Sequence, residues 1–85
     1  LFRSKLGNIY VKKAHDFYQI ADLTIGSPNY SANRSKLNDF YEKALAYYEK
    51  LRQLKPNEPS LWTDGLQEVY FKLNKGDELR KLERH

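Results

Sequence analysis

The 85-residue sequence contains no cysteine and no methionine, and it has only four glycines and three prolines. Without cysteine the chain can form neither disulfide bonds nor thiolate metal sites. Its apolar runs are short, and none approaches the roughly 20 residues that a membrane-spanning helix needs. We therefore expect no membrane insertion of this segment. Because methionine is absent even from the first position, we expect a processed product or a piece of a longer protein.

Charge is plentiful but of mixed sign. The chain has 15 Lys and Arg against 11 Asp and Glu, which gives a net charge of +4 and a pI near 9.3. A basic balance is compatible with nucleic-acid binding. However, basic and acidic residues are interleaved, as in Glu42-Lys43 and Glu49-Lys50, and no block of like charges occurs. We interpret the charges mainly as solvated helix surface, which makes nucleic acid the weakest of the candidate partners.

Apolar residues recur at helical spacing over four stretches, at about 2–24, 35–55, 59–73 and 77–84. The clearest stripe, in the second stretch, consists of Leu37, Phe40, Tyr41, Ala44, Leu45, Tyr48, Leu51 and Leu54. We expect Ser35 to cap this helix, Pro56 to end it and Asp77 to cap the last one. No segment has a strand pattern. Short connections favour antiparallel neighbours, so the sequence predicts one all-α domain over 1–85.

The spacing around Pro56 is typical of a helical repeat. The residues at its defining positions are Leu6, Gly7, Tyr10, Ala44, Tyr48, Leu51, Pro56 and Trp62. A small residue such as Ala44 lets two helix backbones approach closely, and an aromatic such as Tyr48 fills the space between layers. Pro56 then ends the helix, because it cannot continue the backbone hydrogen bonds. Upstream, "LGNIY" has the pattern Leu-Gly-x-x-Tyr of a first repeat helix.

These motifs resemble the tetratricopeptide repeat, a helix pair of about 34 residues. The segments "FYEKALAYYEKLRQLKPNE" and "VYFKLNKGDELRKLE" are similar to the C-terminal repeat unit of bacterial multi-repeat proteins of this family. The resemblance implies an α-solenoid of antiparallel helix pairs. It would comprise about one and a half to two repeats, with a lengthened first pair and a short capping helix. Gly65-Leu66 is reversed against the usual order, which leaves the register of the third helix open by one residue.

The resemblance also implies a non-catalytic scaffold that binds a protein or peptide, as the C-terminal capping part of a longer repeat protein. The groove residues it implies are Asn8, Val11, Lys12, Thr63, Gln67, Tyr70 and Phe71. Lys12 beside an aromatic side chain would suit an acidic or amphipathic segment. An alternative is self-association, as a homodimer or by helix swapping, through an apolar flank of Phe2, Ile9, Val11 and Ile20. A periplasmic or cell-surface parent protein is compatible with the resemblance, and a cytoplasmic one stays open.

Residues with catalytic or metal-binding chemistry are sparse. His15 has no further strong ligand at helical spacing, so it is interpreted as a surface histidine rather than a metal ligand. Glu42 and Glu49 lie beside lysines, which favours surface ion pairs over an acid–base pair. The glycines are isolated and form no phosphate-binding loop. We therefore expect no catalytic residues, no cofactor and no metal, and an enzyme is not expected.

Overall fold

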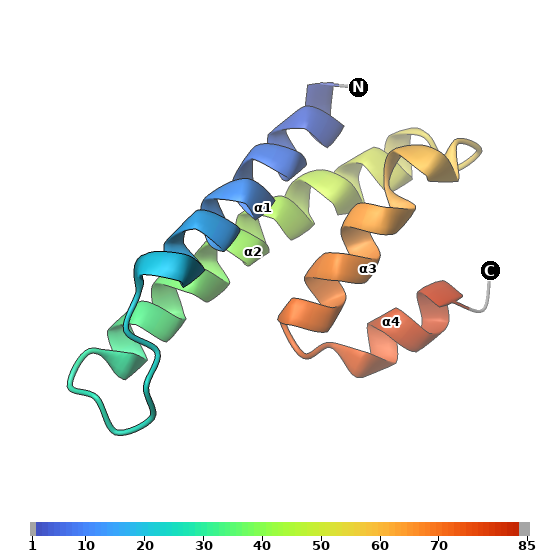
Figure 1. Ribbon diagram of the computed structural model, residues 1–85. Helices are drawn as coiled ribbons and strands as arrows, with labels where there is room; N and C mark the ends of the chain where they lie inside the picture. Colours follow the sequence, from blue (N-terminus) through green and yellow to red (C-terminus); the bar gives the residue numbers. More distant parts are fainter. Residues whose placement is uncertain (1, 84–85) are drawn as a thin grey trace.

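The computed structural model describes residues 2–83, with side chains from residue 5 onward, and Figure 1 shows that they form helices. The elements are α1 (Phe2–Ile20), α2 (Tyr30–Leu54), a short 3-10 helix η1 (Pro59–Leu61), α3 (Thr63–Lys72) and α4 (Gly76–Glu83). Within residues 2–83 there is no strand. The all-α fold class predicted from the sequence is thereby confirmed.

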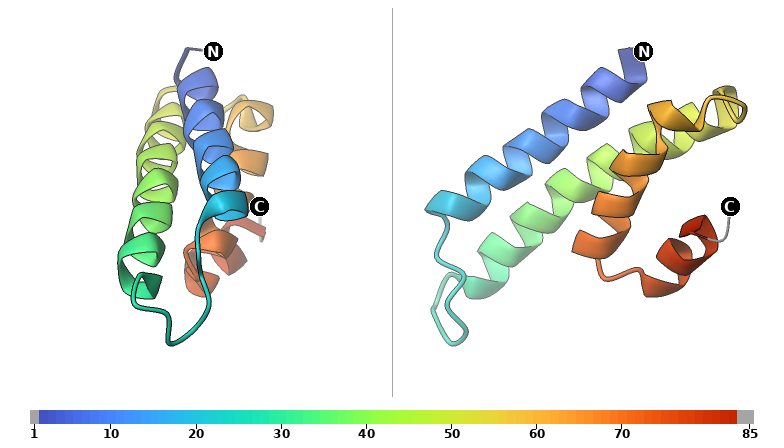
Figure 2. Two further views of the ribbon diagram at one scale, coloured as in Figure 1. Left: turned by 60° about the vertical axis from the view of Figure 1, so that its left-hand side comes forward. Right: turned by 45° about the vertical axis from the view of Figure 1, so that its right-hand side comes forward.

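The two long helices form an antiparallel hairpin, and the rest of the chain folds back along it. α3 packs on α2 and also contacts α1, whereas α4 packs chiefly on α3. Figure 2 shows α3 and α4 on the same side of the α1–α2 hairpin. The molecule is elongated, with extents of 45 × 26 × 15 Å. One side of the hairpin is therefore covered by α3, and a seam runs between α1 and α3.

The turn between α2 and η1 is fixed by proline and tryptophan. α2 ends at Leu54, because the residue before Pro56 is disfavoured in helical conformation. The indole N–H of Trp62 donates a hydrogen bond of 2.9 Å to the carbonyl of Lys55. The guanidinium of Arg52 lies 5.2 Å from the centre of the Trp62 ring. The buried indole thus closes the turn and directs α3 back along α2.

Asp22 organises the loop between α1 and α2. Its carboxylate accepts hydrogen bonds from the backbone N–H of Thr24 at 3.0 Å and the hydroxyl of Ser27 at 2.8 Å. These bonds lower the pKa of the Asp22 carboxyl, and the bond from the Thr24 backbone N–H has the largest effect. The Asp22 carbonyl accepts a bond of 3.0 Å from the side-chain amide of Asn33. The first turn of α2 is therefore tied to the end of α1.

The helix boundaries differ from those predicted. The first helix ends at Ile20 instead of residue 24, and the second begins at Tyr30 instead of residue 35, so Ser35 lies inside α2 rather than capping it. The polar stretch 27–34 favours a loop by composition, but residues 30–34 are helical, and the hydrogen bond from Asn33 to the Asp22 carbonyl stabilises them. The predicted third helix is divided into η1 and α3. Asp77 lies in the first turn of α4 rather than at its cap, and there it pairs with Arg80.

The core is built on the apolar face of α2, and α1, α3 and α4 each contribute buried residues to it. Its buried residues are Val11, Ala14, Leu37, Tyr41, Ala44, Leu45, Tyr48, Leu51, Trp62, Leu66, Val69, Tyr70 and Leu82. Six of the eight α2 residues predicted to face the core are in this set, and Phe40 packs against it. Leu54 is exposed, because α2 extends beyond the hairpin there. The 3.6-residue period therefore locates the core correctly.

Two pairs of aromatic rings lie where α1 meets α2. Tyr10 stacks on Tyr47 with ring centres 5.7 Å apart, and Phe17 meets Phe40 edge-on at 6.0 Å. A lysine ammonium from α2 lies 5.7 Å from the Tyr10 ring centre, and another lies 5.1 Å from that of Phe17. Such cation–π contacts are favourable even when exposed. The rings are therefore already contacted by charged groups of the same chain.

Candidate functional site

Tyr48 projects from α2 between α1 and α3 and meets a glycine on each. A Cβ atom added to Gly7 of α1 would lie 2.7 Å from the tyrosine ring, and one added to Gly65 of α3 would lie closer still. Both distances are shorter than van der Waals contact, so only glycine fits at either position beside this ring. Tyr48 is 2% exposed. The thickness of the ring therefore sets the separation of α1 and α3.

The hydroxyl of Tyr48 reaches the seam between the two helices. It donates a hydrogen bond to Oδ1 of Asn8 on α1. Burial, and secondarily the negative charge of Glu68, raises the pKa of Tyr48 to about 12. The hydroxyl therefore stays neutral at ordinary pH and acts there as a hydrogen-bond donor.

Buried tyrosines make stability depend on pH in the alkaline range. Burial also raises the pKa of Tyr70, from an ordinary value of 10.0 to about 12. The negative charge of Glu49, which accepts a hydrogen bond from the Tyr70 hydroxyl, adds to this effect. Below pH 10 these two tyrosines are neutral in the folded and in the unfolded state, so their contribution to the free energy of unfolding is fully present. Above it the unfolded chain ionises first, so we expect the free energy of unfolding to fall as pH rises towards 12.

The measurement is a series of thermal melts from about pH 9 to about pH 12. Tyr48→Phe and Tyr70→Phe should each lose less stability across this range than the wild-type chain. Tyr18→Phe, at an exposed position, should lose as much as the wild type. All four proteins have the same lysines, so differences between their curves report on the substituted tyrosine. Parallel curves for all of them would contradict the buried, neutral hydroxyls.

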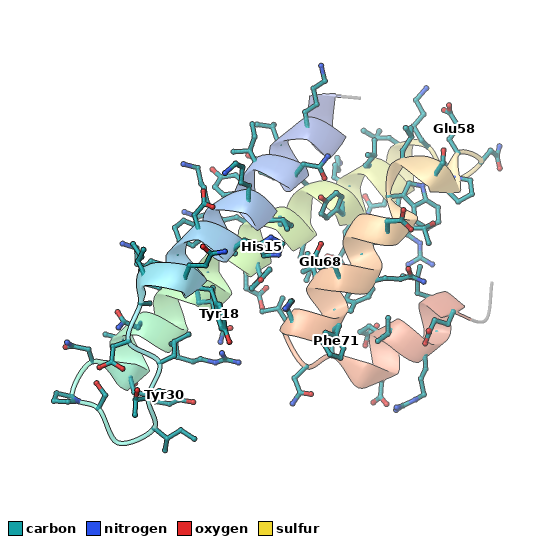
Figure 3. All side chains as sticks on the ribbon, viewed as in Figure 1. His15, Tyr18, Tyr30, Glu58, Glu68 and Phe71 are labelled. Atoms are coloured by element: carbon teal, nitrogen blue, oxygen red, sulfur yellow. The ribbon has the colours of Figure 1, made fainter. Side chains whose placement is uncertain are left out.

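A hollow of about 340 Å³ lies beside Tyr48, between α1 and α3. Its other main lining residues are Asn8, Val11, Lys12, His15, Asp64 and Glu68. Nε2 of His15 and Oε2 of Glu68 are 2.8 Å apart, and Figure 3 shows the two side chains meeting between the helices. This pair joins residues that are 53 positions apart in the chain. It connects the two walls of the hollow.

A second hollow of about 400 Å³ lies next to the first, and His15 lines both. Its walls include Tyr18 on α1, Arg34, Leu37 and Tyr41 on α2, and Phe71 and Lys72 on α3. Tyr18 is 59% exposed and Phe71 is 69% exposed. Figure 3 shows these two rings on opposite sides of one opening. We call the two hollows together the α1–α3 groove.

The groove contains some of the residues predicted for it. Asn8 and Lys12 line it and are exposed, and Phe71 lines its wider end. Val11 also lines it, but its side chain is buried at the base and offers little surface. Lys12 already pairs with Asp16 at 3.0 Å. On α1, therefore, the prediction and the structure agree on the helix face, although not on how much of it is accessible.

On α3, Phe71 lines the groove, whereas the other three residues named from the sequence do not. Thr63 lines a separate hollow near Trp62, Tyr70 is buried in the core, and Gln67 lines neither part of the groove. The residues that face α1 are instead Asp64, Gly65 and Glu68. The reversed order of Gly65-Leu66 is the sequence feature that indicates this rotation of α3, because the glycine must lie against the Tyr48 ring. With the register of α3 open by one residue, the sequence did not identify Asp64 and Glu68 as groove residues, nor His15, which contacts Glu68.

The apolar flank proposed for self-association is smaller than the sequence suggested. Ile9 and Ile20 are 48% and 83% exposed, but Val11 is in the core. The side chain of Phe2 lies outside the described residues. Lys36 and Lys43 extend over the neighbouring rings of the hairpin. Ile9, Val11 and Ile20 therefore do not form one continuous apolar surface.

Other signatures of function were sought in the described part of the chain. Over residues 2–83 no helix is both long and apolar enough to cross a membrane. Nor do three or more His, Asp or Glu side chains of this part cluster in a way that could hold a metal ion. Comparisons with protein-family models, with curated proteins and with solved structures found no match to this chain. The α1–α3 groove is therefore the candidate functional site in the described part of the chain.

Proposed function

We propose that this chain is a protein-interaction module whose α1–α3 groove receives a segment of a partner protein. One observation carries the proposal: Tyr18 and Phe71, both largely exposed, flank the opening of a concave groove. Exposed aromatic side chains at a concave site are favourable anchors, because they bury much apolar area with few rotatable bonds. The groove is also largely pre-formed, since Tyr48 holds its two walls apart. A pre-formed site lowers the entropic cost of binding.

The same proposal includes a repeat architecture of tetratricopeptide type. In it, α1 and α2 form one lengthened helix pair, α3 is the first helix of the next pair and α4 is its shortened partner. The close approach of α1 and α3 on either side of Tyr48, with glycine at both contacts, supports this assignment. Stacked repeats of this kind line a groove with the first helix of each pair. The module would then act as the closing part of a longer stack.

The proposed function is tested by selecting binders and locating where they bind. Peptides selected from a random displayed library on the immobilised protein are synthesised, and their affinities are measured for wild type and for Phe71→Ser. We expect at least a tenfold loss, about 1.4 kcal/mol, because truncating an aromatic anchor commonly costs this much. Phe71 is exposed, so the variant should fold normally, as circular dichroism can verify.

The matched control is Ile25→Ser, which removes another exposed apolar side chain, 85% exposed and outside the groove. It should leave the affinities unchanged. Selected peptides that bind Phe71→Ser as tightly as wild type would place the interaction elsewhere. Failure to select any peptide that depends on the folded chain would contradict the proposed function.

A further inference from the structure

The two ends of the α1–α3 groove differ in charge. At the end near Tyr48, the acidic residues Asp64 and Glu68 line the wall. Lys12 pairs with Asp16, and His15 contacts Glu68. At the other end, the charged side chains among the described lining residues are those of Arg34 and Lys72, both basic. The groove is therefore polarised along its length.

The basic end is formed by Arg34 and Lys72. They come from different elements, α2 and the last residue of α3, and both line the same hollow. Among residues 5–83 neither side chain has an ion pair or a side-chain hydrogen bond. Burial chiefly raises the pKa of Tyr41 in the floor, the negative charge of Glu68 raises it further, and the Arg34 guanidinium lowers it by a smaller amount. Two cations that make no ion pair within residues 5–83 thus lie beside an aromatic opening.

We propose that this end of the groove binds an acidic segment of the partner protein. In the complex a large apolar side chain packs between Tyr18 and Phe71, and adjacent carboxylates pair with Arg34 and Lys72. This inference deepens the proposed function, on which it rests, by naming the chemistry of the partner. The guanidinium matches a carboxylate with two parallel N–H donors, and the ammonium adds a second, less directional charge. A neutral segment would cover both cations without compensating them.

The charge pattern favours a short acidic segment over a nucleic acid. A phosphate backbone carries negative charge at regular intervals along its whole length. Continued along the groove, it would meet Asp64 and Glu68 at the other end. A protein segment can place its acidic residues at one end alone. Binding of an oligonucleotide is therefore an outcome that the test must separate from the proposed one.

The test uses nuclear magnetic resonance titration of the isotope-labelled full chain with defined probes. The acidic probe is a mixture of the pentapeptides Gln-Gln-Xaa-Glu-Glu and Glu-Glu-Xaa-Gln-Gln, with Xaa an equal mixture of Leu, Phe, Tyr and Trp. The second probe has Gln in place of Glu, the third has Lys, and the fourth is oligodeoxythymidine. We expect the acidic probe to shift the signals of Tyr18, Arg34, Phe71 and Lys72. It should bind roughly three- to thirtyfold more tightly than the Gln probe, as two exposed ion pairs provide.

Charge reversal provides the decisive comparison. The double variant Arg34→Glu/Lys72→Glu should lose the acidic probe and gain the Lys probe. Both positions are exposed, so its helix content should be unchanged. The matched control is the double variant Lys50→Glu/Lys81→Glu. It makes the same change in net charge at exposed sites outside the groove, and it should bind like wild type.

Three results would overturn the inference. Equal binding of the Gln probe at the same residues would refute the acidic partner but leave the groove as a peptide site. Tighter binding of oligodeoxythymidine at Arg34 and Lys72 would assign this end to nucleic acid. If no peptide probe shifts the groove signals, the acidic partner is refuted, and the selection experiment with Phe71→Ser then decides separately whether the proposed function stands.

Discussion

Replacing Tyr48 with alanine is expected to lower the free energy of unfolding by about 3–5 kcal/mol, the range for truncating a fully buried aromatic side chain. Tyr48 is 2% exposed and contacts α1 and α3 at once. Alanine would leave an empty space bounded by glycines on two sides, which have no side chains to fill it. The loss is a large share of the roughly 5–15 kcal/mol typical of a small domain. Urea unfolding followed by circular dichroism measures it.

Tyr48→Phe separates the ring from its hydroxyl. It keeps the packing between the glycines and removes only the hydrogen bond to Asn8. Because Asn8 is exposed, water can replace the lost donor. We therefore expect a cost of about 0.5–1.5 kcal/mol for this variant. If Tyr48→Ala and Tyr48→Phe lose similar amounts, the ring does not fill the space between the two helices.

The second large effect is expected at Gly65. In the interior of an ordinary helix, alanine is more favourable than glycine by about 1 kcal/mol. Here the new methyl group would overlap the Tyr48 ring, which cannot move away because Gly7 lies against its other side. Overpacking of this kind costs about 1–3 kcal/mol. Gly65→Ala should therefore destabilise the protein, the reverse of what helix propensity alone predicts.

Gly76→Ala is the matched control for this substitution. Gly76 is also helical, and a Cβ atom there would lie 3.5 Å from the Arg80 guanidinium, an ordinary contact. We expect Gly76→Ala to be neutral or slightly stabilising. Urea unfolding of both variants under the same conditions gives the comparison. An equal or greater stability for Gly65→Ala than for wild type would show that α3 does not approach the ring.

Much of the fold could be predicted from local sequence. The apolar period of α2 identifies its buried face, because that face is a property of one regular helix. Pro56 similarly marks where α2 ends, since its effect is confined to neighbouring residues. Trp62 is buried at the following turn, where the repeat spacing places a large aromatic. These features depend on residues that are close together in the chain.

The features that were missed depend on contacts between distant residues. The early start of α2 follows from the hydrogen bond between Asn33 and the Asp22 carbonyl, which composition cannot show. The His15–Glu68 pair depends on how α3 rotates against α1. That rotation is fixed by the contact of Gly65 with Tyr48, and the sequence left the register of α3 open by one residue. Asp64 and Glu68 could be assigned to the wall of the groove only once that register was known.

The groove and the core are thus linked through one side chain. Tyr48 packs between α1 and α3, and both helices also carry residues of the proposed binding groove. Variants such as Phe71→Ser act on the exposed rim and should change affinity without changing stability. Variants at Tyr48 or Gly65 should change stability, and affinity through the spacing of α1 and α3. This separation distinguishes the two kinds of residue in the same binding assay.

The central claim is that the Tyr48 ring, held between glycines, sets the spacing of α1 and α3. A double-mutant cycle of Tyr48→Ala and Gly65→Ala tests it most directly, with sucrose added equally to all four proteins to keep the weakest folded. We expect Gly65→Ala to cost about 1–3 kcal/mol beside tyrosine, and to cost nothing or to stabilise slightly beside alanine. A cost that is the same in both backgrounds would mean that ring and glycine do not touch, and the claim would be wrong.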